Sequence, residues 1–316
     1  MKYFQKSLVL AITFLMGIQF SCKSENTMLQ EFGNFSIQNH NEIRPVYNEQ
    51  TGFWEMELVS VYQSGPAKVE LLLPDNILEK GVKFPVLYIL PVGGPSSPFG
   101  DGLIEAKKAD LANKYGIICV RPYFTSVPWY GDHAENPHIR HESYLNKCIV
   151  PLIDSLYPTK DNSEGRWLIG FSKSGWGACT LLMRNPDIFG YAAAWDAPFM
   201  LNGENSGQEW GPMGLRVNFG TKKQMQQSLP TTLAENSSWL SKKTLLVIAP
   251  GQYWEKQSKA YHDFLNELRI PHIYRSDLLF KHRWDTGWFV PMVESLISIA
   301  CEQFTAHQPK LDDRLP

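Results

Sequence analysis

The chain has 316 residues, of which 43% are hydrophobic and 13% aromatic, and its formal net charge is −2 at pH 7. A chain of this length can bury a sizeable core in one large domain or two small ones. The sequence has no basic stripe and no acidic tract, so the composition predicts a globular protein and argues against nucleic acid as a partner.

The first 22 residues have the pattern of a secretory signal peptide. Lys2 and Lys6 give a positively charged start, and residues 8–18 form an apolar run that is too short to span a bilayer comfortably. A small residue then precedes Cys22, which resembles the lipobox of bacterial lipoproteins, although residues 19–20 depart from the usual lipobox. We therefore expect export to the bacterial cell envelope, in the periplasm or at the outer membrane, with lipid on Cys22 as the only membrane contact. A plain cleaved signal is the alternative.

Four further cysteines predict mostly free thiols. An exported chain could pair its cysteines, but three of these lie in strand-like or helix-like runs, where a free cysteine packs as a small hydrophobic residue. No Cys-x-x-Cys or cysteine–histidine spacing indicates zinc. The four are Cys119, Cys148, Cys179 and Cys301.

The segments after the signal predict a hairpin followed by buried strands. Residues 23–50 are polar and predict a linker, whereas residues 55–62 and 67–73 partly alternate between polar and apolar, with a turn at 64–66. Continuous apolar runs then follow, as is typical of strands buried on both faces of a parallel sheet. These runs are residues 85–90, 117–120, 167–169, 191–195, 244–248 and 272–274.

Helix-like segments lie between these runs, at residues 104–115, 140–156, 176–185, 255–268 and 289–304. Strands that alternate with helices predict an α/β fold with a mostly parallel central sheet, helices on both faces and the hairpin as an antiparallel edge. We expect one domain over residues 51–305, followed by a tail at 306–316. Residues 200–240, rich in Gly, Ser, Asn and Gln, predict an insertion that is a candidate lid over the site.

The stretch 167–180 predicts a nucleophile elbow, in which a serine lies at a tight turn between a strand and a helix. The apolar residues 167–169 lead into Gly170 and Ser172, and a small residue before the serine lets the strand and the helix approach closely. Ser174 stands where the second glycine of Gly-x-Ser-x-Gly is usual. Ser172 is therefore the candidate nucleophile, and a serine in an ordinary glycine-rich loop is the alternative.

A serine nucleophile needs a base, and in this arrangement the chain order is serine, acid, histidine. Three histidines follow Ser172 within reach of the sheet. His262 lies in a helix-like run, and His272 opens a strand-like run. His282 lies between the last strand and the last helix, where a loop histidine can come back over the serine. We therefore predict His282 as the base, with a structural loop histidine as the alternative.

Two carboxylates compete for the role of the acid that orients the histidine. The usual place is the loop after the fifth apolar run, where Glu255 is the only carboxylate and can instead start the next helix. Asp196 follows the preceding strand, at the carboxyl end where α/β folds place ligand sites. We favour Asp196 over Glu255, with a cap or turn residue as the alternative for Asp196. Asp285 is a third choice, disfavoured because it lies too near His282 in sequence to orient it easily.

The oxyanion of an acyl-transfer intermediate needs backbone N–H donors. One candidate is the amide of Lys173, directly after the serine. The second should come from the loop 91–95 after the first buried strand, where Gly93 and Gly94 let the backbone approach closely. Either Val92 or Gly93 would be this donor.

These motifs resemble the α/β-hydrolase superfamily, and within it the esterases near esterase D and the feruloyl esterases. The resemblance covers roughly residues 54–305. It is carried by residues 170–177, 194–198, 281–284 and 287–288, and residues 128–133 and 140–144 look like an often exported subgroup of hydrolases. The resemblance implies a Ser–His–acid triad, acyl transfer to water and no cofactor. Ser174 and the missing Asp after the fifth apolar run depart from the family pattern.

Residues 124–144 gather aromatic and polar side chains after the second buried strand. Their histidine spacing, His-x4-His-x2-His, matches no metal motif, so we predict no metal site. Trp129 and Tyr130, with Trp176 after the serine, are candidates to line a substrate cleft, where flat aromatics suit a sugar or an aromatic acyl group. Packing of the loop is the competing explanation.

The sequence as a whole predicts a serine esterase that hydrolyses a small-molecule or glycan ester without a cofactor. A carbohydrate-linked ester is the first choice of substrate. A peptidase of the same fold and a non-catalytic binding lipoprotein that retains the fold are the rival hypotheses.

Overall fold

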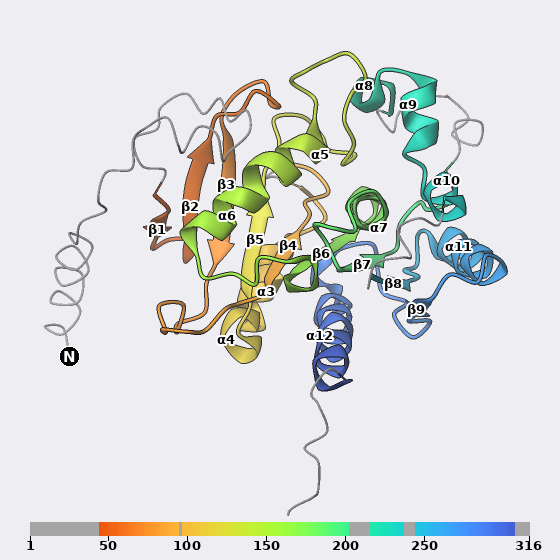
Figure 1. Ribbon diagram of the computed structural model, residues 1–316. Coiled ribbons are helices and arrows are strands. Elements are labelled where there is room, and N and C mark those ends of the chain that lie inside the picture. The colour runs from red at the N-terminus through yellow and green to blue at the C-terminus, as the bar shows by residue number, and fades with distance from the viewer. Residues whose placement is uncertain (1–43, 95–96, 202–214, 237–243, 307–316) are drawn as a thin grey trace, which may run out of the picture. The chain divides into compact units, whose positions relative to one another are not determined.

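The computed structural model describes residues 44–94, 97–201, 215–236 and 244–306, the last six by their backbone alone (Figure 1). The predicted signal, Cys22, most of the predicted linker, the side chain of Cys301 and residues 307–316 of the predicted tail lie outside this description, as do residues 202–214 and 237–243 of the predicted insertion.

A twisted sheet runs through the described part of the chain, with the strand order β1-β2-β3-β5-β4-β6-β7-β8-β9. The strands are β1 (Val46–Asn48), β2 (Phe53–Leu58), β3 (Ala67–Leu72), β4 (Val86–Ile89), β5 (Ile118–Pro122), β6 (Arg166–Phe171), β7 (Tyr191–Trp195), β8 (Leu245–Ala249) and β9 (His272–Tyr274). β1, β2 and β3 pair antiparallel, β3 pairs antiparallel with β5, and the remaining neighbours are parallel. The predicted α/β fold with an antiparallel N-terminal hairpin is confirmed.

The sequence predicts a linker that extends to residue 50, but residues 46–48 form the strand β1. This strand is short, and the side chains of Val46 and Tyr47 are 69% and 50% exposed. It therefore lacks the apolar alternation that marks a strand in sequence. Its backbone pairs with β2 from Val46 opposite Glu55 to Asn48 opposite Phe53.

Helices cover both faces of the sheet (Figure 1). They are α3 (Gly102–Lys108), α4 (Leu111–Tyr115), α5 (His141–Tyr144), α6 (Val150–Leu156), α7 (Lys173–Arg184), α8 (Leu215–Phe219), α9 (Lys222–Gln227), α10 (Pro230–Glu235), α11 (Glu255–Glu267) and α12 (Phe289–Ala306), with a π-helical turn at Leu145–Ile149 and 3-10 turns at Ser163–Gly165 and Trp284–Thr286. No helix among the described residues is long and apolar enough to cross a membrane.

The main core lies between the sheet and the helices α3 and α12. Leu87 and Ile169 from the central strands pack there with Leu103 of α3 and Leu296 of α12. Because side chains alternate along a strand, Gly170 of β6 faces the opposite side, where α7 begins. The wholly buried strands β4 and β7 show why their sequences are continuous apolar runs.

The three predicted buried thiols that the structure describes, Cys119, Cys148 and Cys179, are free and buried.

His141, at the start of α5, is a buried titratable group. Its side chain is fully buried, and Nε2 lies 2.8 Å from the Ser126 hydroxyl. Nδ1 is buried without a hydrogen-bond partner among the described residues, and the ring packs edge-on against Phe124. Burial lowers the pKa of His141 to about 3, because a charged imidazolium is poorly solvated there.

We expect acid to destabilise the fold through His141. Below about pH 6.5 the unfolded chain gains a proton on this histidine and the folded chain does not, until the pH reaches about 3. The free energy of unfolding should therefore fall by about 1.4 kcal/mol per pH unit from this one group. Urea unfolding of the wild type and of His141→Gln between pH 7 and pH 5 measures the effect. The variant should lose stability less steeply, and equal slopes would contradict the assignment.

Candidate active site

Ser172 lies at a tight turn between β6 and α7. Its backbone has φ 54° and ψ −130°, a conformation that non-glycine residues adopt rarely and mostly where function requires it. The Ser172 N–H lies 3.2 Å from both the Trp195 and the Asp196 carbonyl oxygens, so the turn is tied to the end of β7. The structure therefore gives Ser172 the strand–turn–helix setting that the sequence predicts.

Gly170 and Ser174 explain how this turn closes. A Cβ atom on Gly170 would lie 2.3 Å from the Ser174 carbonyl oxygen, so no larger residue fits there. The buried Ser174 hydroxyl accepts from the Phe171 N–H at 3.1 Å and donates to the Phe171 carbonyl at 2.9 Å. The departure from Gly-x-Ser-x-Gly thus adds two hydrogen bonds across the turn.

Asp196 and His282 form a hydrogen-bonded pair beside this turn. His282 Nδ1 donates to Asp196 Oδ2 at 2.6 Å. The second ring nitrogen, Nε2, is not used in this bond. The Asp196 side chain is fully buried, and its backbone is left-handed with φ 45°. It also accepts from the N–H groups of Tyr253, at 3.3 Å, and Trp254, at 2.5 Å. A buried carboxylate needs such donors to replace its lost hydration.

The other two carboxylates considered for this role lie elsewhere. Glu255 starts α11 with an exposed side chain, which fits the favourable position of an acid in the first turn of a helix. Asp285 forms an ion pair with Arg283 at 2.8 Å. The structure therefore brings His282 together with Asp196 and with neither Glu255 nor Asp285.

Gly251 allows the loop after β8 to close over Asp196. A Cβ atom on Gly251 would lie 2.3 Å from Cγ and 2.4 Å from Oδ2 of Asp196. Only glycine lets the backbone pass this close. The same passage brings the amides of Tyr253 and Trp254 to the carboxylate.

Three aromatic rings contact the His282 side chain, which is 17% exposed. The ring centroid of His282 lies 4.9 Å from that of Phe171, 5.6 Å from that of Phe99 and 5.0 Å from that of Tyr253. Phe171 directly precedes Ser172, so its contact with the imidazole places His282 beside the turn. Phe99 and Tyr253 belong to no recognisable motif, so neither could be assigned to the site from sequence.

The candidate oxyanion donors lie on two elements. Lys173 opens the 12-residue helix α7, whose first N–H groups have no partner within the helix. Burial lowers the pKa of the Lys173 ammonium. Val92 is buried and Gly93 is half-buried in the loop after β4, and a Cβ on Gly93 would meet no atom within 4 Å. The backbone of Gly93 is therefore open to approach.

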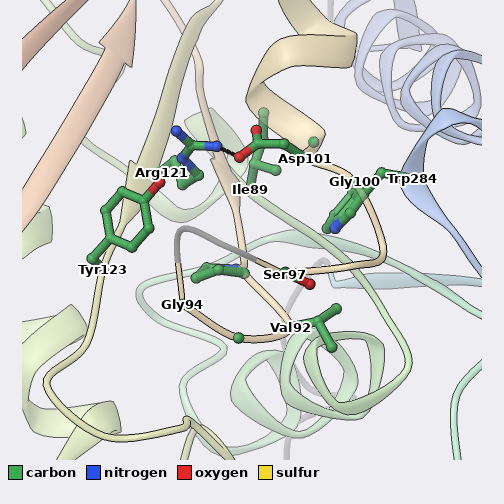
Figure 2. A pocket seen from close by; sticks show the side chains of 12 residues that line it. Ile89, Val92, Gly94, Ser97, Gly100, Asp101, Arg121, Tyr123 and Trp284 are labelled. Carbon is green, nitrogen blue, oxygen red and sulfur yellow. Dashed lines mark ion pairs between the residues drawn. The ribbon is translucent and has the colours of Figure 1, made fainter.

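A small cavity lies behind this loop, lined by Val92, Gly94, Ser97, Arg121 and Trp284 among others (Figure 2). Its volume of about 20 Å³ suits a water molecule.

Asp101 and Arg121 fix the far end of the loop. The buried Arg121 forms ion pairs with Asp101 and Glu70, and Figure 2 shows its guanidinium directed at the Asp101 carboxylate. Asp101 also caps α3 by accepting from the N–H groups of Leu103, at 2.8 Å, and Ile104, at 3.1 Å. Burial lowers the pKa of Arg121 to about 10. One carboxylate thus joins β5 to the start of α3.

The predicted aromatic substrate cleft is wrong. Trp129 and Tyr130 are fully buried, and Trp176 is 1% exposed, so none of the three can contact a substrate in this structure. Trp129 and Trp176 pack edge-on, with ring centroids 5.4 Å apart. They belong to a cluster that includes Phe219, Met225 and other apolar residues of the predicted insertion. Packing, the competing explanation, accounts for these aromatics.

No cluster of three or more His, Cys, Asp or Glu side chains that could hold a metal ion lies in the described part of the chain. In residues 124–144, the Asp132 carboxylate instead accepts from the backbone N–H and the hydroxyl of Ser143, at 3.0 and 2.5 Å.

Comparison with known proteins identifies the family to which this chain belongs. The esterase family model, described as "Putative esterase", matches residues 60–264. An esterase of Mycobacterium tuberculosis (strain H37Rv) is 29% identical over 155 residues, which make up 48% of this chain and 30% of that protein. The matched part is therefore less than a third of the length of that relative.

Solved structures share the fold. A ferulic acid esterase superposes with a TM-score of 0.61 at 17% identity, covering 78% of this chain and 96% of that one. An S-formylglutathione hydrolase from Staphylococcus aureus gives 0.62 at 16% identity, covering 78% and 98%. A fluorophosphonate-binding serine hydrolase of Staphylococcus aureus gives a TM-score of 0.63 at 16% identity, covering 78% of this chain and 98% of that one. The architecture is that of α/β-hydrolases.

We expect Gly251→Ala to separate Asp196 from His282. The added methyl group would overlap the carboxylate, so the loop must shift, at a cost of about 1–3 kcal/mol in the free energy of unfolding. Urea unfolding measures the cost, and proton NMR should show the loss of the downfield Nδ1–H resonance of His282. Gly65→Ala is the control, because its Cβ would meet no atom within 4 Å. A retained resonance in Gly251→Ala would contradict this account of the loop.

Proposed function

We propose, from the premise that this chain belongs to the esterase family and has the α/β-hydrolase fold, that it is a serine esterase using Ser172, His282 and Asp196. The observation that carries the proposal is the 2.6 Å hydrogen bond from His282 Nδ1 to the buried Asp196 carboxylate, beside a serine with strained backbone. In a serine hydrolase the acid fixes the tautomer and orientation of the base in this way.

The proposed reaction has two halves. His282 Nε2 takes the proton of the Ser172 hydroxyl as its oxygen attacks the ester carbonyl, and the tetrahedral intermediate forms. The carbon–oxygen bond to the alcohol then breaks, and His282 gives its proton to the leaving oxygen. Water repeats the attack on the acyl-serine with His282 as base, which releases the acid and restores Ser172. Asp196 stays ionised and stabilises the imidazolium throughout.

The negative charge of each intermediate falls on the former carbonyl oxygen. We propose that this oxygen binds the N–H of Lys173, at the start of α7, together with the N–H of Val92 or Gly93. The half-buried setting of Lys173 and the open backbone face of Gly93 support this assignment.

Replacing single triad members tests the reaction. Ser172→Ala and Asp196→Asn should each lower kcat on p-nitrophenyl acetate by about 10⁴ or more, because triad members act as a unit. Glu255→Gln, a matched carboxylate change on an exposed side chain, should stay within about twofold of the wild type. Collapse of Glu255→Gln with survival of Asp196→Asn would overturn the assignment of the acid.

Labelling and substrate choice distinguish the rival functions. A fluorophosphonate probe should label the wild type and not Ser172→Ala. A wild type that neither labels nor turns over the ester would make a binding protein the leading hypothesis. Faster cleavage of a p-nitroanilide amide than of the matching ester would favour a peptidase over an esterase.

We also propose that the protein is exported and anchored through lipid on Cys22, with a carbohydrate-linked ester of the envelope as substrate. The charged start, the short apolar run and the small residue before Cys22 support the anchor. When the full chain is expressed in a bacterium fed alkyne-tagged palmitate, the wild type should take up the tag and sediment with membranes. Cys22→Ser should lose the tag and become soluble or remain uncleaved. If the wild type did not take up the tag, the result would favour a plain cleaved signal peptide over a lipid anchor.

A further inference from the structure

One large aromatic side chain beside His282 is exposed. The Tyr253 side chain is 68% exposed, and its ring centroid lies 5.0 Å from that of His282 with the planes tilted by 39°. The other two rings against His282 are the buried Phe171 and the partly buried Phe99. Of the three rings that contact His282, Tyr253 is thus the one with a largely solvent-exposed surface.

The backbone beneath Tyr253 is fixed from two sides. Its own N–H and that of Trp254 bind the Asp196 carboxylate, at 3.3 and 2.5 Å. The Gln252 N–H donates to the Phe280 carbonyl at 3.1 Å, and the Gln252 side-chain amide donates to the Leu279 carbonyl at 3.2 Å. The Trp254 ring meets Tyr253 edge-on, with centroids 4.9 Å apart. Binding of a ligand to this ring therefore costs little conformational entropy in this loop.

The proposed chemistry determines which half of the ester meets this ring. His282 must come within hydrogen-bond reach of the leaving alcohol oxygen in order to protonate it. The group attached to that oxygen then lies next to the side chains that surround His282. Tyr253 is positioned for the alcohol half, whereas the acyl half is held at Ser172 and the oxyanion donors.

The polarity of the surroundings favours a sugar over a hydrocarbon. Gln252 and Lys281, on the same two loops as Tyr253 and His282, are exposed, as is Glu255 at the start of α11. A hydrocarbon group gains affinity mainly in a buried concave pocket. A pyranose offers a flat face of C–H groups for stacking and hydroxyl groups for solvent and for polar side chains.

We propose that Tyr253 is a specificity-determining platform that stacks on the sugar ring in the alcohol half of the substrate. This inference rests on the proposed esterase function. It replaces the buried Trp129, Tyr130 and Trp176 as the aromatic surface for a carbohydrate. The Tyr253 ring contributes binding energy for the sugar and takes no part in bond breaking.

Two acetate esters of primary alcohols test the platform on the purified full-length protein. They are methyl 6-O-acetyl-glucopyranoside and ethyl acetate, which share the acyl group and differ in the alcohol. Tyr253→Ala should raise KM for the sugar ester about five- to tenfold, the scale of one aromatic contact, and leave kcat within about twofold. Its kcat/KM on ethyl acetate should stay within about twofold of the wild type.

Matched variants give the controls. Tyr253→Phe and Tyr253→Trp keep a ring and should keep the low KM for the sugar ester. Tyr47→Ala removes another exposed tyrosine, on β1 at the far edge of the sheet, and should change neither substrate. Melting temperatures of all variants show whether each one is folded.

Several outcomes would overturn the platform. Equal losses on both esters in Tyr253→Ala would mean that the ring acts by holding His282, and no change on either would mean that it binds nothing. A wild type that hydrolyses ethyl acetate but not the sugar ester would refute the platform and leave the esterase function intact. A wild type inactive on both esters and unlabelled by a fluorophosphonate would refute the esterase function and the platform with it.

Discussion

The buried carboxylate of Asp196 connects three segments of the site through its hydrogen bonds. A fully buried charge is unstable without hydrogen-bond donors, and this one has three N–H groups, from His282, Tyr253 and Trp254. The carbonyl oxygen of the same residue lies 3.2 Å from the Ser172 N–H. One residue at the end of β7 thus holds together the serine turn, the histidine loop and the loop after β8.

The proposed position of the acid, on Asp196, changes what the loop after β8 can do. In the more common arrangement that loop supplies the acid itself. Here it contains Gly251, which passes within van der Waals distance of Asp196, and it contributes backbone amides to the carboxylate. Its side chains are thereby free to point outward, and Tyr253 does so beside His282. The buried setting of Asp196 and the exposure of Tyr253 both follow from the path of this loop.

Much of this could be predicted from sequence, because the strongest signals are local. The fully buried β4 and β7 appear as continuous apolar runs, and the elbow at Ser172 appears as a strand, a small residue and a helix within 14 residues. The choice between Asp196 and Glu255 stayed open, because both follow strands and only packing decides which one His282 reaches. The cleft prediction failed for a similar reason. The residues that cover Trp129 and Trp176, such as Phe219 and Met225, are distant in sequence and could not be assigned to them.

The loop after β4, which carries the candidate oxyanion donors, is joined directly to the segment that follows His282. The Trp284 N–H donates to the Phe99 carbonyl at 2.8 Å, and Arg283 donates to the Pro98 carbonyl at 2.5 Å. Asp101, at the end of the same loop, is joined to Arg121 on β5. The loop after β4 therefore has its far end tied to the sheet and to the segment that follows His282. Electrostatic stabilisation of an intermediate requires donors that are already oriented before charge develops. In the proposed mechanism, the contacts of Phe99 and Pro98 with the segment after His282 would keep the base close to the loop that carries the candidate donors.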